Sequence, residues 1–143
     1  MSKKWYLIAN ATEARIYTRN LDNNQLECLE TLTHPESRMK GSELSSDRPG
    51  HYQSAGNGRG AFVEKTDPKE YEAERFAMEI GKFLNSERTQ NKYSDLCISA
   101  APHFHGLINK YLDKQVSALV SKHADKDLMQ IAESKLAETF ASL

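Results

Sequence analysis

A long stretch without apolar periodicity divides this chain of 143 residues and limits the folds that the chain can adopt. The stretch covers residues 34–66 and includes SDRPGHYQSAGNGRGAF at 46–62. A connection of this length without regular elements is uncommon inside a compact domain. It therefore indicates a functional loop, disorder or a wrong assignment of elements. The segments on either side decide whether the gap is real.

Three extended segments precede the stretch. KWYLIANA at 4–11 is a nearly continuous apolar run, which is typical of a buried strand. ARIYTRN at 14–20 alternates, with Ile16 on one face and Tyr17 on the other. LECLETLT at 26–33 resumes the extended pattern after a turn rich in Asp and Asn. Three strands joined by short turns predict an antiparallel meander.

A helix with a clear start follows the stretch. Asp67 suits the N-cap, Pro68 the first helical position, and Glu70 the third position of a capping box. An apolar stripe at helical spacing continues from this start: Ala73, Phe76, Ala77, Ile80 and Leu84. Because the meander and this helix both have clear limits, the gap between them is a real connection.

The remainder of the chain alternates strands and helices. YSDLCISAA at 93–101 predicts a buried strand, and Pro102 begins a second helix. The inner face of that helix is predicted to hold Phe104, Leu107, Ile108, Tyr111 and Leu112. VSALVSKH at 116–123 predicts a strand, with a helix left open, and Asp125 or Asp127 caps a last helix. The last helix is predicted to bury Leu128, Ile131, Ala132, Leu136 and Phe140.

The predicted element order is βββ, long loop, αβαβα, in a single domain that covers residues 1–143 with its loop at about 34–66. A meander followed by alternating helices and strands predicts an α/β fold with a mixed sheet and helices on both faces. Ribonuclease-H-like domains use this order.

Bulk properties restrict the function. The formal net charge is -1, so the whole chain has no general affinity for nucleic acid, and any basic site must be local. Cys28 and Cys97 lie in strand-like segments, without a CxxC spacing, and are predicted to be buried thiols in a reducing compartment, with a disulfide left open as the alternative. The apolar run WYLIANA near the start is too short for a signal peptide or a membrane span. We therefore expect a cytoplasmic protein without a membrane partner.

Metal-dependent nuclease chemistry is disfavoured by the strand ends. A ribonuclease-H-type nuclease needs carboxylates that converge on two metal ions, including one on the first strand. The first strand here ends in Asn10, and the fourth offers only Asp95, near its beginning. The chain also lacks GxSxG, a P-loop and GxGxxG after a strand. No metal and no cofactor is expected.

The start of the second helix is one candidate site, formed by Asn10, His103 and His105. Open sheets bind ligands beyond the carboxyl ends of their parallel strands. Helix N-termini attract anions, and a histidine can donate, accept or carry a proton near neutral pH. The alternative is two exposed turn histidines with no shared role.

The long loop is the second candidate site. Its candidate binding residues are Arg38, Asp47, Arg48, His51, Tyr52, Gly58 and Arg59. Arginine, glycine and an aromatic ring together suit an RNA backbone and a stacked base. Glycines also allow several backbone N–H groups to approach a phosphate. The alternative is a mobile, solvated loop.

Over nearly its whole length, the chain resembles the bacterial host-attachment family, described as proteins required for attachment to host cells. The order and spacing of several segments carry this resemblance: WYLIANATEARIY, HPESR, SDRPGH, GNGRGAF, TDPKEYEAERFAMEIGKFL, YSDLCISAAPHFHGLINKYL and HADKDL. His105 and Asn109 differ from the Leu-Gly and Arg that the family has in that turn.

The resemblance implies a relation to the catalytic domain of archaeo-eukaryotic peptide-chain release factors, which is ribonuclease-H-like. In those proteins, the loop between the meander and the first long helix carries a Gly-Gly-Gln tripeptide that assists hydrolysis of peptidyl-tRNA. Here the corresponding segment is GNGRGAF, which has no Gly-Gly pair, and Gln53 precedes the glycines. The hydrolysis is therefore not implied, whereas contact with the ribosome, rRNA or tRNA is.

Three functions follow from the sequence. The first is a ribosome- or RNA-binding module of undefined activity, for which binding is expected rather than catalysis. The second is a hydrolase that acts on an ester or phosphate near His103 and His105. The third is a protein-interaction subunit, and a homo-oligomer stays open. A cytoplasmic chain without an anchor is a poor candidate for a direct adhesin.

Overall fold

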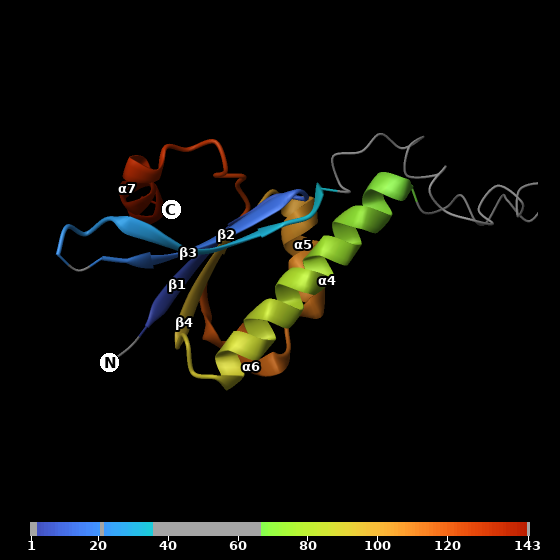
Figure 1. Ribbon diagram of the computed structural model, residues 1–143, viewed down its shortest axis with the longest axis horizontal. Helices are drawn as coiled ribbons and strands as arrows, with labels where there is room; N and C mark the ends of the chain where they lie inside the picture. Colours follow the sequence, from blue (N-terminus) through green and yellow to red (C-terminus); the bar gives the residue numbers. More distant parts are fainter. Residues whose placement is uncertain (1–2, 21, 36–66, 143) are drawn as a thin grey trace, which may run out of the picture.

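A computed structural model describes residues 3–20, 22–35 and 67–142 of the chain (Figure 1). Its centre is a five-stranded mixed sheet in the order β3-β2-β1-β4-β5. Helices lie on both sides of this sheet, so the α/β class predicted from the sequence is confirmed.

The first three strands form the predicted meander. β1 (Lys4–Ala9) pairs antiparallel with β2 (Glu13–Arg19), which pairs antiparallel with β3 (Leu26–Thr33). On its other side, β1 pairs parallel with β4 (Asp95–Ser99), and β4 pairs parallel with β5 (Val120–Ala124). The sheet thus has an antiparallel half and a parallel half that share β1.

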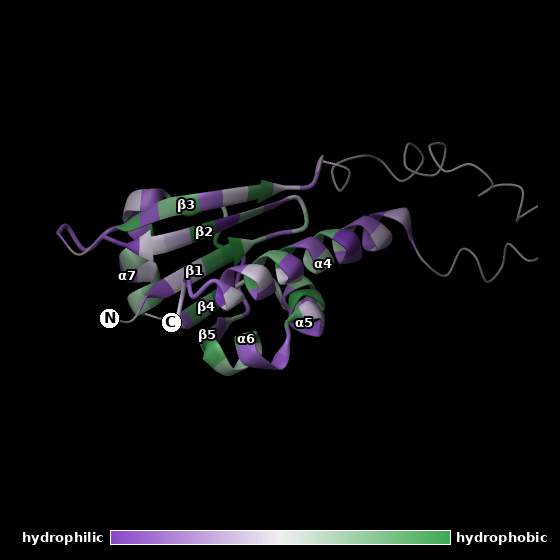
Figure 2. Cartoon of the chain, turned by 60° about the horizontal axis from the view of Figure 1, so that its bottom comes forward, coloured by the Kyte–Doolittle hydropathy of each residue, from purple (hydrophilic) through white to green (hydrophobic). Residues whose placement is uncertain are grey.

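Two long helices cover one face of the sheet. α4 (Pro68–Thr89) and α5 (Pro102–Tyr111) pack together on this face, and the short α6 (Lys114–Leu119) follows them. The 3-10 helix η2 (Glu133–Lys135) and α7 (Leu136–Ala141) lie on the opposite face. Apolar and hydrophilic bands alternate along α4 (Figure 2), as expected of a helix with one buried side.

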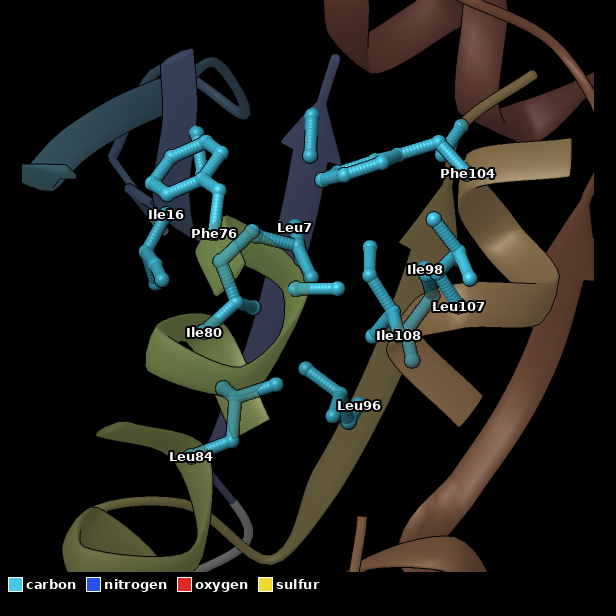
Figure 3. Close-up of a cluster of buried hydrophobic side chains, with 14 of the residues drawn as sticks. Leu7, Ile16, Phe76, Ile80, Leu84, Leu96, Ile98, Phe104, Leu107 and Ile108 are labelled. Atoms are coloured by element: carbon cyan, nitrogen blue, oxygen red, sulfur yellow. The ribbon is translucent and has the colours of Figure 1, made fainter. Parts of the chain in front are cut away.

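The main hydrophobic core lies between the sheet and α4 with α5. Register places Leu7 of β1 opposite Ile16 of β2 and Ile98 of β4, so these side chains leave the same face of the sheet. They meet Phe76 and Ile80 of α4 there (Figure 3). Each such side chain contributes about 1.5–3 kcal/mol by its burial. The predicted stripe of α4 is confirmed, because all of its members are buried.

A smaller core lies on the opposite face. Tyr6 is paired in register with Tyr17 and with Cys97, and these residues pack with Leu136 and Phe140 of α7. Ile16 and Tyr17 therefore enter different cores, which confirms the alternation predicted for 14–20.

The segment predicted as a strand over 116–123 contains two elements. Its first part is the helix α6. Asp113 is the N-cap of this helix, and its Oδ1 accepts a hydrogen bond from the Val116 amide at 2.8 Å. Val116 is fully buried, so helix packing decides the conformation there. The strand β5 begins only at Val120.

The predicted last helix is wrong over residues 125–132. Asp127 Oδ1 accepts a hydrogen bond from the Met129 amide in a turn, and the helical structure begins only at Glu133. Leu128 is buried as expected without belonging to a helix, whereas Ile131 is exposed. Leu128 therefore contacts the smaller core from a turn, and the apolar spacing of this segment did not come from a helix.

Two smaller expectations also need correction. Cys97 is buried, but Cys28 lies on the edge strand β3 and is exposed. Asp67 and Pro68 begin α4 as predicted, yet within the described residues Asp67 makes no side-chain cap hydrogen bond. The Glu70 carboxylate binds His103, as described below, so it contacts a neighbouring helix. No helix within residues 3–20, 22–35 and 67–142 combines the length and the apolar character needed to cross a membrane.

Candidate functional site

The predicted binding loop lies outside the described residues. This applies to all of its candidate side chains: Arg38, Asp47, Arg48, His51, Tyr52, Gly58 and Arg59. The structure does describe both ends of the connection, where β3 ends at Thr33 and α4 begins at Pro68.

A buried polar contact joins these two ends. The His34 amide donates to the Thr12 carbonyl at 2.9 Å, which fixes the backbone directly after β3. His34 Nε2 lies 2.8 Å from Glu72 Oε1, and both side chains are almost completely buried. The imidazole also stacks on Phe76, with 5.4 Å between the ring centroids. The end of β3 is thereby fastened to the first turns of α4.

Further charged groups surround this pair. Glu79 Oε1 lies 3.5 Å from His34 Nδ1, and Arg75 Nη1 lies 3.7 Å from Glu72 Oε1. A carboxylate is rarely buried unless such partners compensate its lost hydration. Glu72 precedes Phe76 by four residues and thus lies on the core side of α4. That spacing is the signal in the sequence that could have identified Glu72 as a buried, paired residue.

Asn10 has a local structural role. Its Oδ1 accepts three hydrogen bonds of 2.9 Å, from the amide and hydroxyl of Thr12 and from the amide of Glu13. These bonds close the turn between β1 and β2, where asparagine is a common turn former. The carbonyl end of the Asn10 side chain is therefore engaged within its own turn.

His103 lies on the surface at the start of α5. Its Nε2 is 2.8 Å from Glu70 Oε1 and 2.9 Å from Glu70 Oε2. The His103 side chain is 71% exposed and that of Glu70 is 40% exposed. The contact links the first turns of α4 and α5 across water-accessible surface.

His105 is buried and points to different partners. Its Nδ1 lies 3.0 Å from Asp125 Oδ1 and 3.2 Å from the Ala124 carbonyl oxygen. Its Nε2 lies 2.8 Å from Nδ1 of His123, an exposed residue of β5. Burial, followed by the effect of His123, lowers the pKa of His105, and Asp125 only partly opposes this. The neutral imidazole is therefore favoured at neutral pH.

The three residues predicted to share a site thus have separate partners. Asn10 binds its own turn, His103 binds Glu70, and His105 binds the end of β5. The structure instead brings together His105, His123 and Asp125, two of which the site prediction did not include. Their signal in the sequence is HADKDL, directly after a predicted strand.

The described residues also form a surface groove of about 510 Å³ along the outer side of α4. Tyr71, Met78, Glu79 and Lys82 are among its lining residues. At one border, Glu74 Oε2 accepts hydrogen bonds from Lys110 Nζ, at 2.6 Å, and from the Tyr111 hydroxyl. These bonds lower the pKa of Glu74. Within residues 3–20, 22–35 and 67–142, no cluster of three or more His, Cys, Asp or Glu is placed to hold a metal ion.

Comparison with known proteins places this arrangement in a family. A family profile described as "Protein required for attachment to host cells" matches residues 5–139. No curated protein sequence matches the chain significantly. Among solved structures, one described as an archaeal protein aligns over 98% of this chain, with 12% identity and a TM-score of 0.45. This chain spans 36% of the length of that archaeal protein. Because the profile extends from the first strand into the last helix, the chain belongs to the family of proteins required for attachment to host cells.

Proposed function

We propose that the protein is a cytoplasmic ribosome- or RNA-binding module whose binding segment is residues 36–66. The observation that carries this proposal is the buried pair of His34 and Glu72, which holds the end of β3 against the start of α4. The described residues on either side of the connection are therefore held close to one another. Binding residues are often carried on loops positioned by a rigid scaffold.

The proposal includes a ribonuclease-H-like fold and a relation to the catalytic domain of release factors. The strand order β3-β2-β1-β4-β5, with an antiparallel and a parallel half, supports it. On this basis, residues 36–66 occupy the position of the loop that carries Gly-Gly-Gln in release factors. Since the chain lacks that tripeptide, we propose binding without hydrolysis of peptidyl-tRNA.

The chemistry of the segment suits a single-stranded or looped RNA. Arg48 and Arg59 supply charge for phosphates, and Tyr52 and His51 supply rings for base stacking. Gly58 allows the backbone to approach a ligand closely. Residues 36–66 contain five Lys and Arg and four Asp and Glu, so the proposed attraction to RNA comes from particular arginines and not from net charge.

Co-sedimentation of the full chain with ribosomes, at low and at moderate salt, tests this proposal. We expect wild-type protein to sediment with ribosomes at low salt and to dissociate steeply as salt rises, because phosphate contacts release counterions. The double variant Arg48→Ala/Arg59→Ala should bind less at every salt concentration and show a shallower salt dependence.

A matched control separates specific contacts from bulk charge. Lys92 and Lys114 are exposed cations in the described part of the chain, so Lys92→Ala/Lys114→Ala removes the same charge elsewhere. This control should bind like wild type. The proposal is wrong if wild-type protein stays off ribosomes, or if both double variants lose the same amount of binding.

The two alternatives differ in their support. A hydrolase that uses His103 and His105 together is weakened, because these residues have different partners. A protein-interaction subunit is favoured by the groove on α4, where Tyr71 is 43% and Met78 is 40% exposed. A stable dimer in light scattering that Met78→Glu dissociates, with no ribosome binding, would select this alternative.

A further inference from the structure

We propose that His123 is the proton-accepting residue of a hydrolytic site for uncharged carboxylic esters, with His105 and Asp125 as its positioning residues. The site lies at the carboxyl ends of β4 and β5, beside the start of α5. It is separate from the proposed RNA-binding segment.

The hydrogen bonds of this cluster define where the protons lie. The Ala124 carbonyl can only accept, so the contact from His105 Nδ1 requires a proton on Nδ1. The Asp125 carboxylate accepts from the same N–H. The Nε2 of neutral His105 then has only a lone pair, and its 2.8 Å contact requires a proton on His123 Nδ1. The Ala124 carbonyl thus determines which ring nitrogen carries the proton in His105 and, through His105, in His123.

The remaining nitrogen of His123 is therefore a free base. With its proton on Nδ1, neutral His123 carries a lone pair on Nε2, and no described residue makes a hydrogen bond to that atom. His123 is exposed on an edge strand, so Nε2 is open to solvent. Fixing the tautomer of a histidine through its other ring nitrogen is a common way to prepare it for proton transfer.

When the two histidines take up a proton, that proton resides on His123, because the buried His105 ring stays neutral. The titratable groups that act on His105 are His123 from β5 and Asp125 directly after it. Burial and His123 lower the pKa of His105, so the neutral form of the buried ring is favoured. Protonated His123 can still donate from Nδ1 to His105, and Asp125 stabilises the positive charge through the His105 ring.

The position in the fold suits a reaction site. Ligands bind at the carboxyl ends of parallel strands in open α/β sheets. The Ala100 amide donates to the Ala124 carbonyl at 3.1 Å, which places the start of α5 next to the end of β5.

Local charge selects the substrate class. Asp125, whose side chain is 68% exposed, and the exposed Asp127 follow His123 by two and four residues, with Lys126 between them and Lys122 directly before His123. These two carboxylates and two ammonium groups leave no net positive charge to bind a phosphate ester, whereas an uncharged carboxylic ester needs no charged partner.

The reaction needs water as its only co-reactant. His123 Nε2 takes a proton from water while the water oxygen forms a bond to the ester carbonyl carbon. The resulting tetrahedral oxyanion collapses and breaks the bond to the alcohol oxygen. The departing alkoxide takes the proton from protonated His123, which releases a carboxylic acid and an alcohol and restores the base.

Hydrolysis of p-nitrophenyl acetate by the full chain tests the proposal. All variants carry Cys28→Ser, because the exposed Cys28 thiol also reacts with this ester. We expect repeated turnover that rises with pH through a single ionisation. His123→Gln should lower the rate constant by about tenfold or more, as expected for loss of a general base.

His103→Gln is the matched control. It also removes an exposed histidine that is hydrogen-bonded to a neighbour, so its rate should equal that of the parent. Equal rates for the parent and His123→Gln, or equal losses in both variants, would overturn the proposal. Unchanged ribosome co-sedimentation of His123→Gln would keep this result separate from the RNA-binding proposal.

His105 variants test positioning. His105→Leu fills the buried space without an acceptor for His123, so the rate should fall and the midpoint of the pH profile should move. His105→Gln retains an acceptor oxygen and should recover part of the rate. Thermal melting confirms that each variant is folded. If folded His105→Leu keeps the parent rate and pH profile, His105 does not position His123.

Discussion

His34 Nε2 lies 2.8 Å from Glu72 Oε1, and both side chains are at most 5% exposed. A few residues away on the same helix, Glu70 forms an equally short contact with His103 Nε2 at the surface. Both are histidine–glutamate contacts, but the first is buried beside Arg75 and Glu79, whereas the second is exposed. They therefore offer a direct comparison of buried and exposed histidine–glutamate contacts within one protein.

Glu72→Ala should reduce the free energy of unfolding by about 1–3 kcal/mol, because it removes the carboxylate that lies 2.8 Å from Nε2 of the buried His34. Glu70→Ala should cost at most about 1 kcal/mol, because water replaces the lost contact of an exposed pair. Urea unfolding of both variants measures the difference. Equal losses would show that the burial of Glu72 does not determine its contribution.

The sequence predicted the elements whose signals are local. Pro68 and Pro102 begin α4 and α5 as expected, because proline at the first turn fixes the backbone without losing a hydrogen bond. The boundary between α6 and β5 at Val120 was not predicted. It depends on the buried position of Val116 and on parallel pairing with β4, which are both tertiary effects.

The candidate site at the start of α5 also depends on tertiary contacts that the sequence does not reveal. Strand and helix ends predicted one site for Asn10, His103 and His105, whereas the structure gives each of them a separate partner. Side-chain direction depends on partners that are distant in sequence, such as Glu70 for His103 and His123 for His105. Glu72 lies on the same side of α4 as the apolar stripe, so its carboxylate was a usable signal for a buried pair.

Gly81→Ala should destabilise the protein by about 1–3 kcal/mol, because the new methyl group overpacks the contact between α4 and α5. A Cβ at position 81 would lie 2.7 Å from both the Cβ and the carbonyl oxygen of Tyr111. Gly106→Ala is the control, because nothing lies within 4 Å of its added Cβ. It should stabilise α5 by about 0.5–1 kcal/mol through helix propensity. The melting temperature and the urea midpoint should therefore fall for Gly81→Ala and rise for Gly106→Ala.

His105 should make the fold less stable in mild acid. The pKa of folded His105 lies below the ordinary value of 6.5, because burial disfavours the charged ring. Between these two pKa values, the unfolded chain binds more protons than the folded chain, so stability rises with pH and is lost as pH falls below 6.5. His105→Leu removes this contribution. Urea unfolding at about pH 5 and about pH 7.5 should show a smaller pH-dependent loss for the variant. Identical losses would contradict the burial effect.

The two cysteines should differ sharply in reactivity. Cys28 is exposed on the edge strand β3, whereas Cys97 is 1% exposed between the sheet and α7. A thiol that is buried in the core is protected because a reagent cannot reach its sulfur atom while the protein is folded. Under native conditions a coloured disulfide reagent should therefore label Cys28 rapidly and Cys97 only as the protein unfolds. Cys28→Ser should abolish the rapid phase and leave the slow one. A fast reaction of Cys97 in the folded variant would show that α7 does not cover that face of the sheet in solution.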